Sequence, residues 1–332
     1  MAAYKDIKGT QVPVVSSDLG NPVKGQIWYN TTSQLLKGQV FVAAAWATAN
    51  NATTARYSMA GTGTQTAQLS CAGETPPGSP NSTNNTEEYD GTNWTNGGNL
   101  PVAKRACQSF GTQTAAVNAA GLQPSPGSVY NTSEEYNGSA WTAGGTLTTA
   151  RSSLSASGIL TAGLVYGGGI PGSPGKTVAT EEYDGSSWTN GGNLTLERKV
   201  AAASVNGTQS ASYMTTGSAP PGLTAATEEY DGSSWTGGGN AITAREQAMG
   251  GGTLTAGLLS GGNSSAPAIL TSTEIYNGTS WAAGGNLNAG RVLGAAGGTQ
   301  AAGIVAFGTP GPGIATEEYT GAGPQTKTIT GS

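Results

Sequence analysis

Hydrophobic positions in this chain occur in short runs, and turns rich in glycine and polar residues separate them. Ser58–Gly61 and Val200–Ser204 are typical runs, too short for helices, and Gly, Asn and Asp follow such runs throughout. The 332 residues include 54 glycines, a content that suits short strands joined by tight turns and disfavours long helices. The pattern predicts an all-β protein.

One phrase recurs along the chain: Glu-Glu-Tyr, then Asp-Gly or Asn-Gly, a tryptophan, and an arginine about ten residues later. Successive tryptophans are 46 to 48 residues apart: Trp46, Trp94, Trp141, Trp188, Trp235 and Trp281. The tyrosines are Tyr89, Tyr136, Tyr183, Tyr230, Tyr276 and Tyr319. The arginines are Arg56, Arg105, Arg151, Arg198, Arg245 and Arg291. A fixed period of this length indicates a repeat architecture.

Each repeat divides into four predicted strands. The first follows the arginine, and a Gly-Thr-Gln turn comes after it in four repeats, as at Gly63–Gln65. The second strand ends in glycine, the third carries Glu-Glu-Tyr, and the fourth carries the tryptophan. The Asp-Gly or Asn-Gly between the last two is a strong hairpin signal, since both residues tolerate positive φ. Four antiparallel strands in each repeat match the blade of a β-propeller.

The two ends of the array are incomplete in complementary ways. The last repeat runs from Arg291 to Tyr319 without a tryptophan strand, and Trp46 has no repeat before it. We therefore expect the Trp46 segment to pair beside Thr316–Tyr319, completing a sixth blade and removing the open sheet edge. This divides the chain into an N-terminal arm (1–45), a propeller (46–323) and a C-terminal tail (324–332).

The order of arginine, hairpin, paired glycines and Tyr-Asp-x-x-x-Trp resembles the kelch repeat over residues 46 to 320. Two departures occur. The paired glycines after the second strand are complete only at 167–168 and 261–262, and the fourth repeat has two extra residues between Arg198 and Gly207. Both departures are expected in turns. The resemblance implies a six-bladed kelch-type β-propeller, a fold that serves many functions.

The repeated charged and aromatic residues have a functional and a structural interpretation. Six arginines could form a ring that binds an anion, but acid and base recur together, so we expect each arginine to pair with a repeated glutamate and loop carbonyls. The tyrosines and tryptophans are predicted to form the core between blades rather than platforms for sugars. Adjacent glutamates on a strand point to opposite faces, which excludes them as the paired carboxylates of a glycosidase.

Composition excludes several classes of function. With a net charge of −5 and only 14 basic residues, the chain has no footprint for nucleic acid. It contains no histidine, the commonest general base and metal ligand, so we predict no catalytic residues, no metal and no cofactor. Cys71 and Cys107 are expected to be buried free thiols. No apolar run is long enough to insert into a membrane.

The loops between the second and third strands are the variable parts of the repeats. All six contain proline and differ in sequence, and strand alternation puts them on one face together with the tryptophan-to-arginine connections. Repeat proteins tend to carry insertions on their binding face. The candidate binding residues in these loops are Asn84, Tyr130, Lys176, Leu223, Ile269 and Ile314.

The N-terminal region carries a second resemblance. Residues 25–33, Gly-Gln-Ile-Trp-Tyr-Asn-Thr-Thr-Ser, followed by Leu36-Lys37, are similar to segments of tail and fibre proteins of bacteriophages, particularly those of marine bacteria. The region reads as a short extended segment at 11–15 followed by strand, turn and strand. We expect it to attach the protein to other virion proteins, with Val14, Ile27, Trp28 and Tyr29 as candidate attachment residues.

Together these features predict a bacteriophage virion structural protein, associated with the tail or a fibre and not an enzyme. Its loops would bind a host-surface glycan or receptor, or neighbouring virion proteins, in many copies per particle. A low-charge surface without an export signal suits a protein made in the host cytoplasm and released in the virion by lysis. The alternatives are a head decoration or fibre protein of the virion and, in another class, a cellular kelch scaffold for protein partners.

Overall fold

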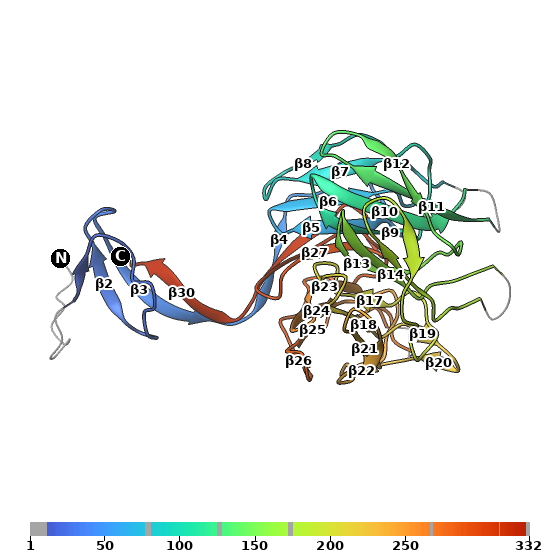
Figure 1. Ribbon diagram of the computed structural model, residues 1–332. Helices are drawn as coiled ribbons and strands as arrows, with labels where there is room; N and C mark the ends of the chain where they lie inside the picture. Colours follow the sequence, from blue (N-terminus) through green and yellow to red (C-terminus); the bar gives the residue numbers. More distant parts are fainter. Residues whose placement is uncertain are drawn as a thin grey trace. The chain divides into compact units, whose positions relative to one another are not determined.

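The computed structural model describes residues 12–76, 81–124, 128–171, 175–265, 268–311 and 313–329. The chain forms two compact units (Figure 1). The larger unit is Ala45–Thr320, and the smaller one combines Met1–Ala44 with Gly321–Ser332. Residues 1–11 of the expected arm and 330–332 of the expected tail lie outside the described residues.

The larger unit consists of four-stranded antiparallel sheets arranged like blades (Figure 1). The first three sheets are β5(Ala60–Thr64), β6(Ala67–Cys71), β7(Thr86–Tyr89), β8(Trp94–Asn96); β9(Gln108–Thr112), β10(Ala115–Leu122), β11(Val129–Tyr136), β12(Trp141–Thr146); and β13(Ser155–Ile159), β14(Ala162–Tyr166), β15(Thr180–Tyr183), β16(Trp188–Asn190). The next three are β17(Ala202–Ala203), β18(Ser212–Thr215), β21(Thr227–Tyr230), β22(Trp235–Gly237); β23(Met249–Thr253), β24(Ala256–Ser260), β25(Thr273–Tyr276), β26(Trp281–Ala283); and β27(Ala295–Gly298), β28(Ala302–Ala306), β29(Thr316–Thr320), β4(Ala45–Ala49). A small ribbon joins β19(Ser218–Ala219) to β20(Gly222–Leu223).

The predicted hairpin between the third and fourth strands is confirmed. Tyr183 pairs with Trp188, and Gly185 between them has a φ of +95°. The carboxylate of Asp184 accepts the backbone N–H groups of Ser186 and Ser187, both at 2.8 Å. An Asx turn of this kind fixes the tight reversal that brings tyrosine and tryptophan side by side.

The predicted closure of the array is also confirmed. Strand β4 pairs antiparallel with β29, and Tyr319 lies opposite Trp46. The first strands of the sheets contact one another in chain order, β5 to β9, β13, β17, β23 and β27, and β27 contacts β5 again. The last sheet is therefore built from both ends of the array.

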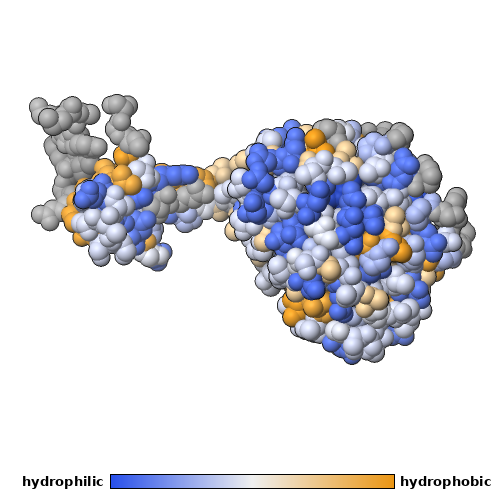
Figure 2. Space-filling view, turned by 90° about the horizontal axis from the view of Figure 1, so that it is seen from above, coloured by the Kyte–Doolittle hydropathy of each residue, from blue (hydrophilic) through white to orange (hydrophobic). Residues whose placement is uncertain are grey.

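The face of this unit that Figure 2 shows is mostly polar, as the abundance of Ser, Thr, Asn and Gly leads one to expect. No helix in the part of the chain that the structure describes has the length and hydrophobicity needed to cross a membrane.

The smaller unit is one four-stranded sheet in the order β1(Val14–Val15), β2(Ile27–Asn30), β3(Leu35–Val42) and β30(Gly323–Thr328). Strand β1 is parallel to β2, and the other pairs are antiparallel. The expected strand, turn and strand are β2 and β3. Residues 324–332, which the sequence analysis set apart as a tail, begin within β30, because a strand from the far end of the chain completes the hydrogen bonding of β3.

Candidate functional site

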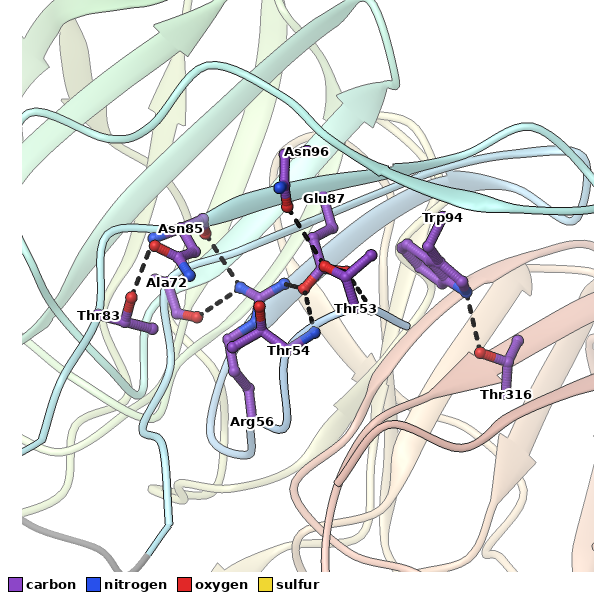
Figure 3. Close-up of polar contacts among 10 residues, drawn as sticks. All are labelled: Thr53, Thr54, Arg56, Ala72, Thr83, Asn85, Glu87, Trp94, Asn96 and Thr316. Atoms are coloured by element: carbon purple, nitrogen blue, oxygen red, sulfur yellow. Dashed lines mark hydrogen bonds and ion pairs between the residues drawn. The ribbon is translucent and has the colours of Figure 1, made fainter. Parts of the chain in front are cut away.

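Five of the six repeated arginines are buried, and each of the five forms an ion pair with a glutamate. Arg56 forms an ion pair with Glu87 at 3.0 Å and donates to the carbonyls of Ala72 and Asn85 (Figure 3). Glu87 in turn accepts the backbone N–H and hydroxyl of Thr53, both at 2.7 Å (Figure 3). Burial lowers the pKa of Arg56, and the adjacent carboxylate opposes that shift.

Four further pairs repeat this arrangement: Arg151–Glu181, Arg198–Glu228, Arg245–Glu274 and Arg291–Glu317. The prediction that the arginines serve the fold is confirmed for these five.

The second sheet departs from this pattern and corrects one assignment. Its buried cation is Lys104, which pairs with Glu134, and not Arg105. Arg105 lies one residue further on, is partly exposed, and pairs with Glu74 at 3.2 Å. Lys104 follows Trp94 by the same ten residues that separate Trp188 from Arg198. The ten-residue spacing after the tryptophan therefore identifies Lys104 as the equivalent residue, although it is not an arginine.

The tryptophans link each sheet to its neighbour. Each indole N–H donates to a hydroxyl on the third strand of the preceding sheet, at 2.9 to 3.2 Å. Trp94, for example, donates to Thr316 (Figure 3). The six pairs are Trp46–Thr273, Trp94–Thr316, Trp141–Thr86, Trp188–Ser133, Trp235–Thr180 and Trp281–Thr227. All six indoles are buried, so the expected role in the core is confirmed and stacking on a sugar is excluded for them.

The second glutamate of each pair holds the tyrosine of the following sheet. Tyr230 donates to Glu182 at 2.6 Å, and the others are Tyr89–Glu318, Tyr136–Glu88, Tyr183–Glu135 and Tyr276–Glu229. The two glutamates of a repeat thus serve different contacts, which agrees with their expected separation to opposite faces. Neither member is a free carboxylate for catalysis.

The glutamine of the Gly-Thr-Gln turn has a role that sequence reasoning missed. Gln113 Nε2 donates to the carbonyls of Gln68 and Tyr89 in the preceding sheet, at 3.1 and 2.8 Å. Gln65, Gln209 and Gln300 make the equivalent pairs of bonds. Most of the repeated residues are therefore used in contacts between sheets.

A second feature missed from sequence is a ring of residues two positions after each buried cation. Their backbone φ lies between +50° and +58°, although none is glycine: Ser58, Ala106, Ser153, Val200, Gln247 and Leu293. Each backbone N–H donates to the carbonyl of the preceding member at 2.7 to 3.1 Å, and Ser58 closes the circle by donating to Leu293. A left-handed residue with a side chain costs roughly 1–2 kcal/mol, so the surrounding structure must enforce this conformation.

This ring forms the mouth of a cavity of about 270 Å³, here called the axial cup. Its second layer consists of the next residue in each sheet: Met59, Cys107, Leu154, Ala201, Ala248 and Gly294. Arg105 and Leu122 also line it, and Arg105 is held by Glu74. Most of the lining residues are apolar, and Ser58, Gln108, Ser153 and Gln247 are the neutral polar residues among them. Such a lining suits an uncharged ligand that has both an apolar face and hydroxyl or amide groups.

The two extra residues of the fourth repeat close the opposite end. Asn206 Nδ2 donates to the carbonyl of Gly63 at 2.9 Å, across the ring of first strands. Val205 beside it is buried. A cavity of only about 40 Å³ lies between this closure and the cup, among Gly61, Gly250 and small neighbours. The segment of Val205 and Asn206 therefore lies over the end of the ring opposite the cup.

The loop residues predicted from sequence do not line the cup. Ile269 is 40% exposed, and Lys176 and Leu223 are half-buried and pair within their own loops. Asn84 donates to the carbonyl of Leu100, and Ile314 packs against a core cluster. Tyr130 lies in β11, beside the Lys104 ammonium at 5.9 Å. They belong to six different repeats, Tyr130 and Leu223 lie in strands, and the part of all six in binding stays a prediction.

The candidate attachment residues divide between the two faces of the smaller sheet. Trp28 is wholly buried and donates to Asp18 at 3.2 Å. Val14, Ile27 and Tyr29 lie on the opposite face, because Val14 pairs with Tyr29 and side chains alternate along β2. Trp28 therefore belongs to the small core of this unit.

The two cysteines are free and buried, as predicted. Asn118 Nδ2 donates to both sulfurs, at 3.3 and 3.4 Å. Burial raises the pKa of Cys71 to about 12 and also raises that of Cys107, so both stay protonated thiols. Within the described residues, no cluster of three or more His, Cys, Asp or Glu side chains is arranged to hold a metal ion.

Comparison with protein-family profiles finds no match, and comparison with curated proteins finds none either. Among solved structures the chain is similar to the one titled "Structure of YjhT", with a TM-score of 0.67 and 14% sequence identity. The similarity covers 83% of this chain and 99% of that one. At this identity the likeness establishes a propeller-like all-β fold and nothing about activity.

Proposed function

We propose that the larger unit is a six-bladed kelch-type β-propeller that binds an uncharged ligand in its axial cup and is not an enzyme. The observation that carries the proposal is the contrast between repeated and variable residues. The repeated Arg, Glu, Tyr, Trp and Gln side chains are occupied by contacts within and between sheets, whereas the ring at the cup's mouth differs from repeat to repeat. Variable side chains on a constant frame are what a recognition site requires.

The ligand class follows from the lining. The cup offers hydroxyl and amide groups beside apolar walls, and its one cationic side chain, Arg105, already has a carboxylate partner. A neutral sugar residue of a host-surface glycan fits this chemistry, with the hydroxyls satisfied by the polar groups and the ring face against the apolar wall. The candidate loop residues would extend the contact around the same face.

We further propose that the protein is a structural component of a bacteriophage virion, associated with the tail or a fibre and present in many copies. This rests on the resemblance of residues 25–33 and on the polar, low-charge surface. Display in many copies would convert weak binding in each cup into firm attachment of the particle. The smaller unit would supply the contacts that hold the protein in the virion.

A glycan array with the full chain and two variants tests ligand binding. Ala248→Trp fills the cup, and Thr189→Trp adds the same bulk on an exposed strand as a matched control. We expect the wild type and the control to bind the same neutral glycans and Ala248→Trp to lose them. Equal binding by all three would place the ligand elsewhere. No glycan binding together with capture of a protein partner would favour the scaffold alternative, and turnover of a sugar would reveal an enzyme.

A further inference from the structure

The backbone of the ring at the mouth of the axial cup is used up by the ring itself. Each of the six N–H groups donates to the carbonyl of the ring member in the preceding sheet, from Ala106 to Ser58 and so on around to Ser58, which donates to Leu293. The ring therefore has no free backbone donor for a ligand. Hydrogen bonds donated to a ligand at the mouth must come from side chains.

The side chains of the ring alternate between polar and apolar. In the order in which their backbones are bonded, the members are Ser58, Ala106, Ser153, Val200, Gln247 and Leu293. All six are partly buried, and all six line the cup. The polar members come from every second sheet, so they surround the mouth at regular intervals with an apolar residue between each two.

The three polar side chains of the ring are available to a ligand. Among the residues that the structure describes, the hydroxyls of Ser58 and Ser153 and the amide of Gln247 have no hydrogen-bond partner. The repeated polar side chains behave differently, since Gln113, for example, donates to two carbonyls of the preceding sheet. The unused polar groups of the propeller frame are thus gathered at this mouth.

The layer below the ring gives the cup a largely apolar floor. Five residues line both the cup and the cavity of about 40 Å³ behind it, and so lie between the two: Met59, Gln108, Ala201, Ala248 and Gly294. Gln108 is the polar one, and its Oε1 accepts the backbone N–H of Ser109 at 3.1 Å. Arg105, the charged residue of the described lining, is held by Glu74 at 3.2 Å and by the Ser82 hydroxyl at 3.4 Å.

We infer that the cup selects a single neutral pyranose residue, and that Ser58, Ser153 and Gln247 determine its specificity. A pyranose carries hydroxyls around its edge and C–H groups on its two faces. Its edge faces the three polar side chains, each of which bonds a different hydroxyl, and one C–H face rests on the floor. The volume of about 270 Å³ is just below the roughly 300–1,000 Å³ of sites for drug-sized ligands, which suits one sugar residue. The inference rests on the proposed binding of an uncharged ligand in the cup.

The test measures, by NMR titration, the affinity of the full chain for the methyl pyranosides of glucose, galactose and mannose. Ser58→Ala, Ser153→Ala and Gln247→Leu each remove one polar group, and Ala106 and Leu293 show that the ring accommodates both replacements at positive φ. We expect each variant to bind the preferred sugar about 3- to 10-fold more weakly, because one hydrogen bond between neutral groups is lost.

Thr189→Ala is the matched control, since it removes a hydroxyl from an exposed position of β16, and it should bind like the wild type. Tryptophan fluorescence reports that each variant is folded. Monodeoxy derivatives of the preferred sugar then identify the hydroxyl that each side chain bonds. Each variant should become insensitive to the loss of one hydroxyl, a different one in each case, so that the two changes are not additive.

The outcomes separate this inference from the proposed function. Unchanged affinity in all three variants, with binding still abolished by Ala248→Trp, would overturn the inference and leave binding in the cup standing. Binding that Ala248→Trp does not affect would overturn both. Binding of none of the three sugars would overturn the inference, as would a preference for methyl glucuronopyranoside, which would assign the selection to Arg105.

Discussion

Five of the six contacts between neighbouring sheets contain a tyrosine–glutamate bond, and one does not. Where β25 meets the last sheet, the position of the second glutamate is Ile275. The Tyr319 hydroxyl lies beside Gly284 as Tyr136 lies beside Gly97, yet it has no acceptor among the described residues. The same contact keeps its tryptophan bond, from Trp46 to Thr273. The contact between the sheet of β25 and the last sheet therefore lacks the tyrosine–glutamate bond and keeps the tryptophan bond.

The comparison shows how stability is distributed in a repeat protein. Each contact contains a buried hydrogen bond from an indole. Five of the six add a tyrosine–carboxylate bond, and four add the two hydrogen bonds from a glutamine side chain to carbonyls of the preceding sheet. The contact of Tyr319 shows that the ring tolerates the loss of one of these. It also supplies an internal control, since the other five contacts are made by the same residue types.

Breaking a buried arginine–glutamate ion pair should cause the largest loss of stability. The last sheet has such a pair, Arg291–Glu317, as four other sheets do. Arg198→Met and Arg291→Met should each destabilise the fold by about 3–5 kcal/mol, because Glu228 or Glu317 would be left buried without its partner. Chemical denaturation would measure both. Similar losses would show that the last sheet differs only at its tyrosine, whereas a much smaller loss for Arg291→Met would show that the whole sheet is weaker. Arg105→Met, which removes a partly exposed pair, is the mild control.

Glu182→Ile would copy the exceptional contact into an ordinary one. Tyr230 would lose its acceptor, and we expect a loss of about 1–3 kcal/mol in the free energy of unfolding. The control is Glu182→Gln, which keeps an acceptor and should recover most of the loss. If Glu182→Ile left the free energy of unfolding unchanged, the tyrosine–glutamate bonds would contribute nothing to stability. The contact of Tyr319 would then be as stable as the other five.

Removing the tyrosine hydroxyl should affect stability where the hydroxyl has a glutamate acceptor and not where it lacks one. Tyr230→Phe is expected to cost about 1 kcal/mol, since it removes a hydrogen bond to a carboxylate. Tyr319→Phe should be neutral or slightly stabilising, because its hydroxyl is buried without an acceptor. Thermal denaturation of the two variants, side by side, measures the difference. Equal costs for both would contradict it.

Ile275→Glu should supply the acceptor that the Tyr319 hydroxyl lacks. The new carboxylate would stand where Glu229 stands for Tyr276, and we expect a gain of about 0.5–1 kcal/mol. The gain must vanish in the Tyr319→Phe background if it comes from the restored bond. A double-mutant cycle on these two positions measures that coupling directly.

The smallest effect is a dependence on alkaline pH. Burial, followed by the hydrogen bond to glutamate, raises the pKa of Tyr136, Tyr183, Tyr230 and Tyr276 to about 12. The unfolded value is about 10, so this stabilisation is complete below pH 10 and is lost as the pH rises through about 12. Phenolate absorbance should show these tyrosines ionising together with unfolding, and the Glu182→Ile variant should shift part of that titration.

The fold was largely readable from sequence because each repeat carries its own turn chemistry. The Asp-Gly hairpin, the pairing of tyrosine with tryptophan, the closure by Trp46 and the arginine–glutamate pairs were all predicted and confirmed. The second sheet was misassigned, because arginine was sought and the spacing pointed to Lys104. The cup was missed because variable residues carry no repeated signal, although variation at a fixed place in a constant repeat was itself the available clue.

By itself the sequence determined the local structure and which residue types pair with each other. Turns, strand alternation and acid–base pairing act between residues that are close together in the repeat. Only the tertiary structure decided which sheets exchange hydrogen bonds, that six left-handed residues meet in one ring, and that Asn206 reaches Gly63 across it. It also decided that β30, from the far end of the chain, joins β3. Contacts between distant segments such as these depend on how the whole chain folds, and the residues within one repeat do not specify them.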